Sequence, residues 1–249
     1  MSTPISAGSA GSAGAKSRPG RTKGWHELPV LVIIALLLAV LVKTFLIQAF
    51  FIPSGSMEKT LHGCPGCRGD RVLVNKVLYK VRDIRRGEIV VFNGVDSFDT
   101  EVPEPAPANG VQRAVRGFTR LVGLGAPGEK DYIKRVIGLP GDRIACCSDG
   151  HVTVQPKGGA TAIVLDEPYL YEDDHQVFCA AGTDAQCPPG AEGVLVPAGR
   201  LWVMGDHRGA SSDSRANGTI PIDRVIGRAF VVVWPFPRVT TLPVPTTFR

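Results

Sequence analysis

Aromatic and charged residues are scarce in this sequence of 249 residues. Aromatic residues make up 7% of the chain and charged residues 20%, whereas there are 29 glycines and 20 prolines. Few long charged side chains and many turn-forming residues are more typical of a β protein than of a helical bundle. We therefore expect a mostly β fold, and the sequence shows no internal repeat.

Two further features that the sequence lacks exclude classes of function. The net charge is +5, but no basic stripe is interleaved with aromatic residues, so nucleic acid is not an expected partner. The positive charge fits affinity for anionic membrane lipid instead. The sequence also lacks a G-x-S-x-G elbow, and no histidine, His207 included, has an evident acid or serine partner. A Ser-His-Asp hydrolase is therefore disfavoured.

No uninterrupted run of 20 apolar residues occurs, but one segment comes close. Residues 28–42 carry no charge, and Lys43 interrupts the run before Thr44-Phe45-Leu46-Ile47. A membrane span needs roughly 20 apolar residues, a length reached at Ile47 if Lys43 extends its amine towards the interface. We predict a single transmembrane helix over residues 25–48.

The segment before this helix sets the predicted orientation. Residues 1–24 are rich in Ser, Gly and Ala and contain basic residues without an acid, so we expect a disordered cytoplasmic tail and an extracytoplasmic remainder. A cleavable signal peptide and a buried core helix are the alternatives. The long basic region and the lack of a small-x-small site argue against the former.

The six cysteines fit a domain outside the cytoplasm. Cys179 and Cys187 close a short loop rich in Gly and Pro, and we predict a disulfide between them. Cys64 and Cys67 have the C-x-x-C spacing of redox and zinc sites. No second C-x-x-C, histidine pair or βαβ pattern accompanies them. We therefore expect no metal and no cofactor, and the role of this pair stays open.

Short apolar or alternating segments separated by turns predict strands after the anchor. The predicted strands are 71–77, 88–92, 132–137, 151–155, 162–165, 200–204 and 228–234. Leu139-Pro140-Gly141-Asp142 suits a type II turn, because Pro fixes φ and Gly accepts positive φ. Residues 93–130 show little periodicity and are predicted to be a loop insertion.

Ser56 is a candidate nucleophile. It lies in Ile52-Pro53-Ser54-Gly55-Ser56-Met57, where Gly55 would let a substrate carbonyl approach the backbone. Backbone N–H groups and the Ser54 hydroxyl could then hold an oxyanion. Taken alone, Ser-Gly-Ser is a common loop sequence.

Lys134 is the candidate base. It lies in a predicted apolar strand, where burial would favour the neutral amine, and a neutral amine can accept a proton from a serine hydroxyl. Residues 205–215 contain two Asp, two Arg and three Ser. They form either a solvated loop or a hydrogen-bonded scaffold in which Asp213 pairs with Arg215 and Ser211 orients the lysine.

Together these segments resemble the bacterial type I signal peptidases, which are membrane-bound Ser/Lys serine endopeptidases. The motifs occur in the family's order: Pro53-Ser54-Gly55-Ser56-Met57 with Leu61, then 69–76, 86–92, 132–142 and 205–215. The resemblance implies an all-β catalytic core over residues 49–144 and 200–249, with a variable inserted subdomain at 145–199.

The resemblance also implies roles for individual residues. Ser56 would be the nucleophile and Lys134 the general base, with Ser54 and the Ser56 N–H as the oxyanion hole. Ser211, Asp213, Arg215 and Asp206 would support the site. The pockets for small substrate side chains would be lined by Ile52, Pro53, Met57, Leu61, Tyr132 and Ile133.

Family members cut exported preproteins after Ala-X-Ala-like sites on the outer face of the bacterial membrane, so preproteins and the export machinery are the implied partners. The sequence departs from the family pattern at His207 and Ala210 and at the Cys64–Cys67 insertion. Two rivals remain. A self-cleaving Ser/Lys repressor would need a DNA-binding module and no span. A membrane-anchored binding protein would have an inert Ser/Lys pair.

Overall fold

The computed structural model describes residues 24–64, 67–94, 98, 110, 131–148, 151–170 and 193–248; the side chains of 24–27, 43–45 and 147–148 are not described. The predicted tail, most of the predicted loop at 93–130 and the predicted Cys179–Cys187 disulfide lie outside these residues. The chain forms two units, Met1–Ala39 and Val40–Arg249.

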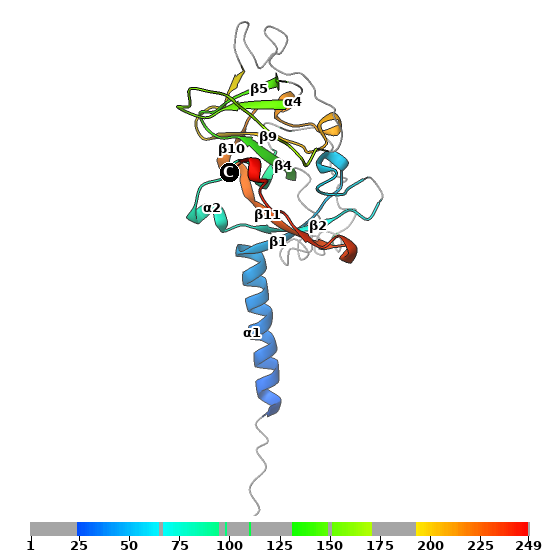
Figure 1. Cartoon of the computed structure of the whole chain (residues 1–249). Helices are drawn as coiled ribbons and strands as arrows, with labels where there is room; N and C mark the ends of the chain where they lie inside the picture. The colour runs from blue at the N-terminus through cyan, green and yellow to red at the C-terminus, as the bar shows by residue number, and fades with distance from the viewer. Residues whose placement is uncertain are drawn as a thin grey trace, which may run out of the picture. The chain divides into compact units, whose positions relative to one another are not determined.

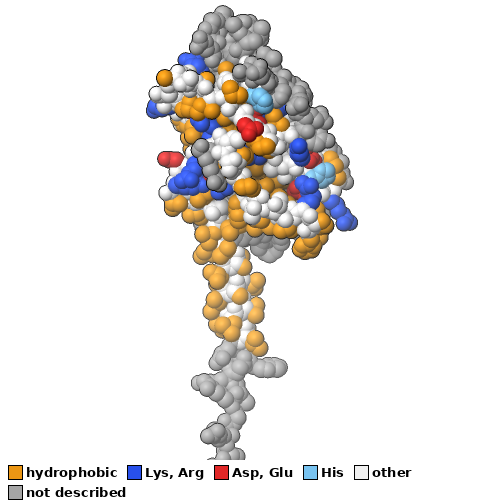
Figure 2. Space-filling model, viewed as in Figure 1, with side chains coloured by type: hydrophobic (Ala, Val, Ile, Leu, Met, Phe, Trp, Pro, Cys, Tyr) orange, Lys and Arg blue, Asp and Glu red, His pale blue; other side chains and the backbone are white. Residues whose placement is uncertain are grey.

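Helix α1 runs over Gly24–Phe45 and contains Pro29, which lies near its start. Its Leu, Ile and Val side chains from Leu28 to Val42 are exposed and give the helix an apolar surface (Figure 2). Judged on the described residues, no helix is both long and apolar enough to qualify as a membrane span. The helix ends before Ile47, which begins the first strand rather than completing the apolar segment.

The larger sheet is eight-stranded and antiparallel in the pairs recorded, in the order β1-β2-β11-β3-β4-β9-β10, with β12 also paired to β11 (Figure 1). The strands are β1 (Ile47–Phe51), β2 (Arg71–Asn75), β3 (Ile89–Asn93), β4 (Asp131–Gly138), β9 (Arg200–Met204), β10 (Ile220–Pro221), β11 (Val225–Trp234) and β12 (Thr240–Thr241).

This sheet confirms the prediction of a mostly β fold and positions the catalytic candidates. β4 lies between β3 and β9, with Lys134 opposite Val90 and Arg135 opposite Met204. The strand predicted at 71–77 ends earlier, at Asn75. There the Asn75 side-chain oxygen accepts hydrogen bonds from the N–H groups of Val77 and Leu78, which turns the chain into α2 (Leu78–Val81).

A second, four-stranded sheet has the order β7-β6-β5-β8. Its strands are β5 (Arg143–Ser148), β6 (His151–Gln155), β7 (Ile163–Val164) and β8 (Val194–Leu195). Ile144, Val152 and Val154 of this sheet share a buried cluster with Trp202 and Met204 of β9. The apolar faces of the two sheets therefore pack together.

The predicted turn between the sheets is present. Gly141 has φ +90°, and the Asp142 N–H donates to the Leu139 carbonyl over 3.0 Å. The remaining described elements are short: α4 (Ser214–Asn217) and the 3-10 turns η1 (Gly55–Met57), η2 (Arg208–Ala210), η3 (Ile222–Arg224), η4 (Phe236–Arg238) and η5 (Thr246–Phe248).

Candidate active site

Ser56 lies in η1, directly after the extended segment that follows β1. Ser54 has extended backbone angles and is exposed, whereas Ser56 and Met57 are turned inward and buried. The Ser54 hydroxyl donates to Ser56 Oγ over 3.4 Å, a long hydrogen bond. The short turn therefore places one serine at the surface and the other in the interior.

Lys134 meets Ser56 from β4, although 78 positions separate them in the chain. The Lys134 Nζ and Ser56 Oγ atoms form a buried hydrogen bond of 2.7 Å, and the lysine is only 4% exposed. An amine and a hydroxyl at this distance, shielded from water, can exchange a proton directly.

Burial changes the protonation of this lysine. Removal of the ammonium from water lowers the pKa of Lys134 to about 8, against the opposing charges of Asp213 and Asp206, while the positive charge of Arg215 lowers it further. At pH 7, about one tenth of the amines is therefore unprotonated and able to act as a base, far more than at the ordinary lysine pKa near 10.4.

The segment 205–215 contains a hydrogen-bonded scaffold built on the buried Asp213, although Gly209, Ala210 and Ser212 are exposed. Asp213 is fully buried and accepts hydrogen bonds from the Gly205 N–H at 2.9 Å and from Arg215 Nε at 2.9 Å. Burial alone would raise the pKa of Asp213, but the hydrogen bond and charge of Arg215 outweigh it and hold the pKa below its usual value. Asp213 therefore stays charged near Lys134.

Ser211 is placed beside this scaffold. Its Oγ is buried, and the Ser211 hydroxyl contributes to the lowered pKa of the Asp213 carboxyl. Gly205 lies between Ser211 and the nucleophile: a Cβ on Gly205 would be 2.2 Å from Ser211 Oγ and 2.4 Å from the Ser56 carbonyl. Only glycine permits this approach, a requirement that the sequence analysis did not assign to Gly205.

Asp206 pairs with Arg135, a residue to which the sequence analysis gave no role. Arg135 Nε and Nη2 bind the two Asp206 oxygens at 2.8 and 2.6 Å, and the Thr60 hydroxyl donates to the same carboxylate at 2.5 Å. The guanidinium also stacks over the Tyr169 ring at 4.0 Å. This pair links β4, the scaffold and the loop after η1.

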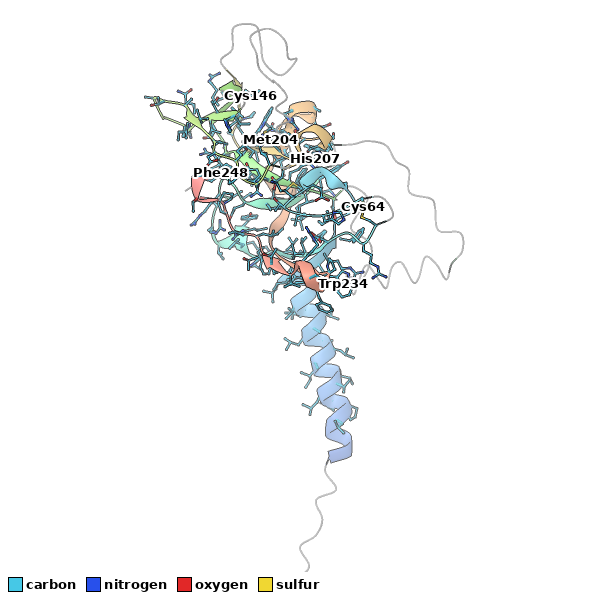
Figure 3. All side chains as sticks on the ribbon, turned by 45° about the vertical axis from the view of Figure 1, so that its right-hand side comes forward. Cys64, Cys146, Met204, His207, Trp234 and Phe248 are labelled. Carbon is cyan, nitrogen blue, oxygen red and sulfur yellow. A yellow bond between two sulfur atoms is a disulfide. The ribbon has the colours of Figure 1, made fainter. Side chains whose placement is uncertain are left out.

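The sequence analysis also missed contacts made by His207 and Arg208. The His207 N–H donates to the Ser56 carbonyl at 3.2 Å, and its ring Nδ1 lies 3.2 Å from the Gly55 carbonyl (Figure 3 labels the residue). Arg208 forms a buried ion pair with Glu167, which belongs to the predicted insert. His207 thus supports the nucleophile turn through its backbone.

The residues predicted to line the substrate pockets differ in their exposure to solvent. Ile52, Met57 and Leu61 are at most 1% exposed and share a core cluster with Ile133. Pro53 is exposed, and the Tyr132 hydroxyl donates to the Phe98 carbonyl at 2.6 Å. In this state, Ile52, Met57 and Leu61 pack in the core beneath the nucleophile turn.

Cys64 and Cys67 are bonded to each other. Within the described residues, His62 joins them as the one group of three side chains whose ligand atoms lie close enough to share a metal ion. With both sulfurs in a disulfide, neither is a thiolate ligand. Cys146 is also disulfide-bonded and lies in another part of the fold (Figure 3).

Comparison with known proteins identifies the family. The model of the family "Signal peptidase, peptidase S26" matches residues 25–234. The chain belongs to this signal peptidase family.

A probable signal peptidase I of Mycobacterium leprae (strain TN) is 38% identical over 239 residues, covering 88% of this chain and 79% of that protein. The signal peptidase I of Mycobacterium tuberculosis (strain ATCC 25618 / H37Rv) is 37% identical over 230 residues, covering 88% and 75%.

A solved signal peptidase I from Enterococcus faecalis V583 is 22% identical with a TM-score of 0.33, and the match covers 59% of this chain and 97% of that chain. Membership therefore depends on the family model and the sequence relatives. Signal peptidases of the S26 family are serine endopeptidases, which confirms the predicted enzyme class.

Proposed function

We propose that this chain removes signal peptides from exported preproteins by a Ser56/Lys134 dyad. Membership of the signal peptidase family supports the activity. The 2.7 Å hydrogen bond between Lys134 Nζ and Ser56 Oγ, in a buried site, carries the assignment of the dyad.

In the proposed reaction, Ser56 Oγ attacks the scissile carbonyl carbon while the neutral Lys134 amine takes the hydroxyl proton. The Ser56 N–H and the Ser54 hydroxyl stabilise the resulting oxyanion. Lys134 then donates the proton to the leaving amine, and a water activated by Lys134 hydrolyses the acyl-enzyme. Asp213, Arg215 and Gly205 keep the lysine and the nucleophile turn in place.

We also propose that α1 anchors the enzyme in the cell membrane, with the tail in the cytoplasm and the β domain outside. The 15 uncharged residues from Leu28 to Val42 and the basic residues before them support this. The test is a cysteine engineered into the tail and a thiol reagent that cannot cross the membrane, added to intact cells. The tail cysteine should stay unlabelled, and its labelling from outside would refute the orientation.

Cleavage of a preprotein is the direct test of the function. The purified full chain in detergent should cut a labelled preprotein after an Ala-X-Ala site, as read by mass spectrometry of both fragments. Ser56→Ala should be inactive, whereas Ser212→Ala, which alters an exposed neighbouring serine of the scaffold, should cleave. Cleavage by Ser56→Ala at the rate of the unmodified protein would refute the assignment of Ser56 as the nucleophile.

The rate should rise with pH. Below the lowered pKa of Lys134, about 8, the amine is protonated and cannot accept the Ser56 proton, so kcat/KM falls as pH falls. We expect an increase of about two orders of magnitude between pH 6 and pH 9, with a plateau above. A substrate without titrating groups near the cleaved bond, and circular dichroism at each pH, exclude other causes. A flat profile over this range would contradict the assignment.

A further inference from the structure

The C-x-x-C pair has no part in the proposed mechanism, yet its loop packs against the nucleophile segment. We call residues 58–64 and 67–70 the CxxC loop. The Asp70 N–H donates to the His62 carbonyl over 2.8 Å. The Asp70 carbonyl accepts a hydrogen bond from the Ile52 N–H over 2.9 Å. A Cβ on Gly63 would lie 2.6 Å from the Ser54 carbonyl. The loop therefore supports the chain that leads into Ser56.

His62 lies between a carboxylate and a disulfide sulfur. Its Nδ1 is 2.5 Å from Glu58 Oε1, and its Nε2 is 3.8 Å from Cys67 Sγ. A carboxylate and a disulfide sulfur carry no hydrogen, so each can only accept a hydrogen bond. The contact with Glu58 orients the ring, so that His62 is the group placed to give a proton to the Cys67 sulfur when the S–S bond opens.

We propose that Cys64–Cys67 is an exchangeable disulfide with a defined polarity, in which Cys67 is the leaving thiolate, and that its redox state sets the rate of cleavage at Ser56. A proton donor beside one sulfur favours that sulfur as the leaving group when the bond breaks. His62 contacts Cys67 through Nε2. The attacking thiolate is therefore directed to Cys64.

The exchange balances with a dithiol as the reductant. Its first thiolate bonds to Cys64 Sγ, the S–S bond breaks, and the electron pair moves to Cys67 Sγ, which is stabilised or protonated by His62. The second thiolate of the dithiol then attacks the dithiol sulfur that is bonded to Cys64. This breaks the mixed disulfide and releases Cys64 as a thiolate, which takes a proton from solvent. The dithiol leaves as an oxidised cyclic disulfide, and the protein has gained two electrons.

The part of this proposal that concerns cleavage rests on the proposed function. Opening the disulfide removes one constraint on the CxxC loop, whose backbone holds Ile52 and touches Ser54. Small displacements of a nucleophile are costly for catalysis, so we expect kcat/KM of the reduced enzyme to fall by about threefold to tenfold.

The first experiment reads the exchange without any need for peptidase activity. The oxidised full chain in detergent is treated briefly with glutathione, quenched with acid, alkylated and mapped by mass spectrometry. We expect the glutathione adduct on Cys64 and the alkyl group on Cys67. His62→Gln should slow reduction by dithiothreitol about tenfold. An adduct mainly on Cys67, or an unchanged rate in His62→Gln, would overturn the polarity.

The second experiment compares preprotein cleavage by oxidised and dithiothreitol-reduced enzyme with cleavage by Cys64→Ser/Cys67→Ser. The double variant should match the reduced enzyme and should not respond to reductant, which separates this disulfide from that of Cys146. Complete reduction without a change in the rate of cleavage would refute the control of cleavage by this disulfide.

One equivalent of zinc retained by the reduced chain would assign His62, Cys64 and Cys67 to metal binding and refute the exchange site. Inactivity in both states would count against the proposed function alone.

Discussion

Lys134→Arg should be as inactive as Lys134→Ala. A guanidinium stays protonated at any pH that the protein survives, so it preserves the positive charge but cannot take the proton of Ser56. Because nucleophile and base act as one unit, removal of either should lower kcat/KM by at least about 10⁴-fold. The measurement is cleavage of a labelled preprotein by purified variants whose melting curves show that they are folded.

Two comparisons sharpen this experiment. Lys80→Arg makes the same exchange at an exposed lysine of the same domain and should keep full activity. Lys134→His supplies a base, but a shorter and differently placed one, so at most a trace of activity should remain. Near-normal turnover by Lys134→Arg would mean that this residue supplies charge alone, and the dyad would have to be abandoned.

Asp206→Asn should strongly destabilise the fold. Arg135 is 2% exposed and both of its oxygen partners on this carboxylate are within 2.8 Å. The amide leaves the guanidinium charge buried and without a counter-ion, which costs about 3–5 kcal/mol. For a domain of this size, that corresponds to a fall in melting temperature of roughly 6–20 °C.

Asp223→Asn is the matched control, because Asp223 is exposed and its loss should change the melting temperature little. The double variant Arg135→Met/Asp206→Leu removes both charges and should be more stable than Asp206→Asn, since no unpaired charge remains. Equal melting temperatures for Asp206→Asn and the unmodified chain would show that the ion pair contributes nothing to the fold.

Most strands of the fold were predictable from local pattern, and two of the exceptions have physical reasons. The strand at 200–204 has the predicted bounds, because its buried apolar run is bordered by turns. β1 was missed because Ile47–Phe51 continues the apolar composition of α1 without a turn signal. β5 was missed because Arg143–Ser148 contains two adjacent cysteines and no alternation of apolar and polar residues.

The sequence predicted the chemistry of the candidate site, since the segments around Ser56 and Lys134 occur in the order of a family whose nucleophile is a serine and whose base is a lysine. Tertiary structure decided what makes that chemistry possible. Register in the sheet brings Lys134 to 2.7 Å from Ser56 in a buried setting that lowers its pKa to about 8. The Arg135–Asp206 pair and the approach of Gly205 join residues far apart in the chain. No local pattern encodes such contacts, because they depend on which surfaces pack together after the strands have paired.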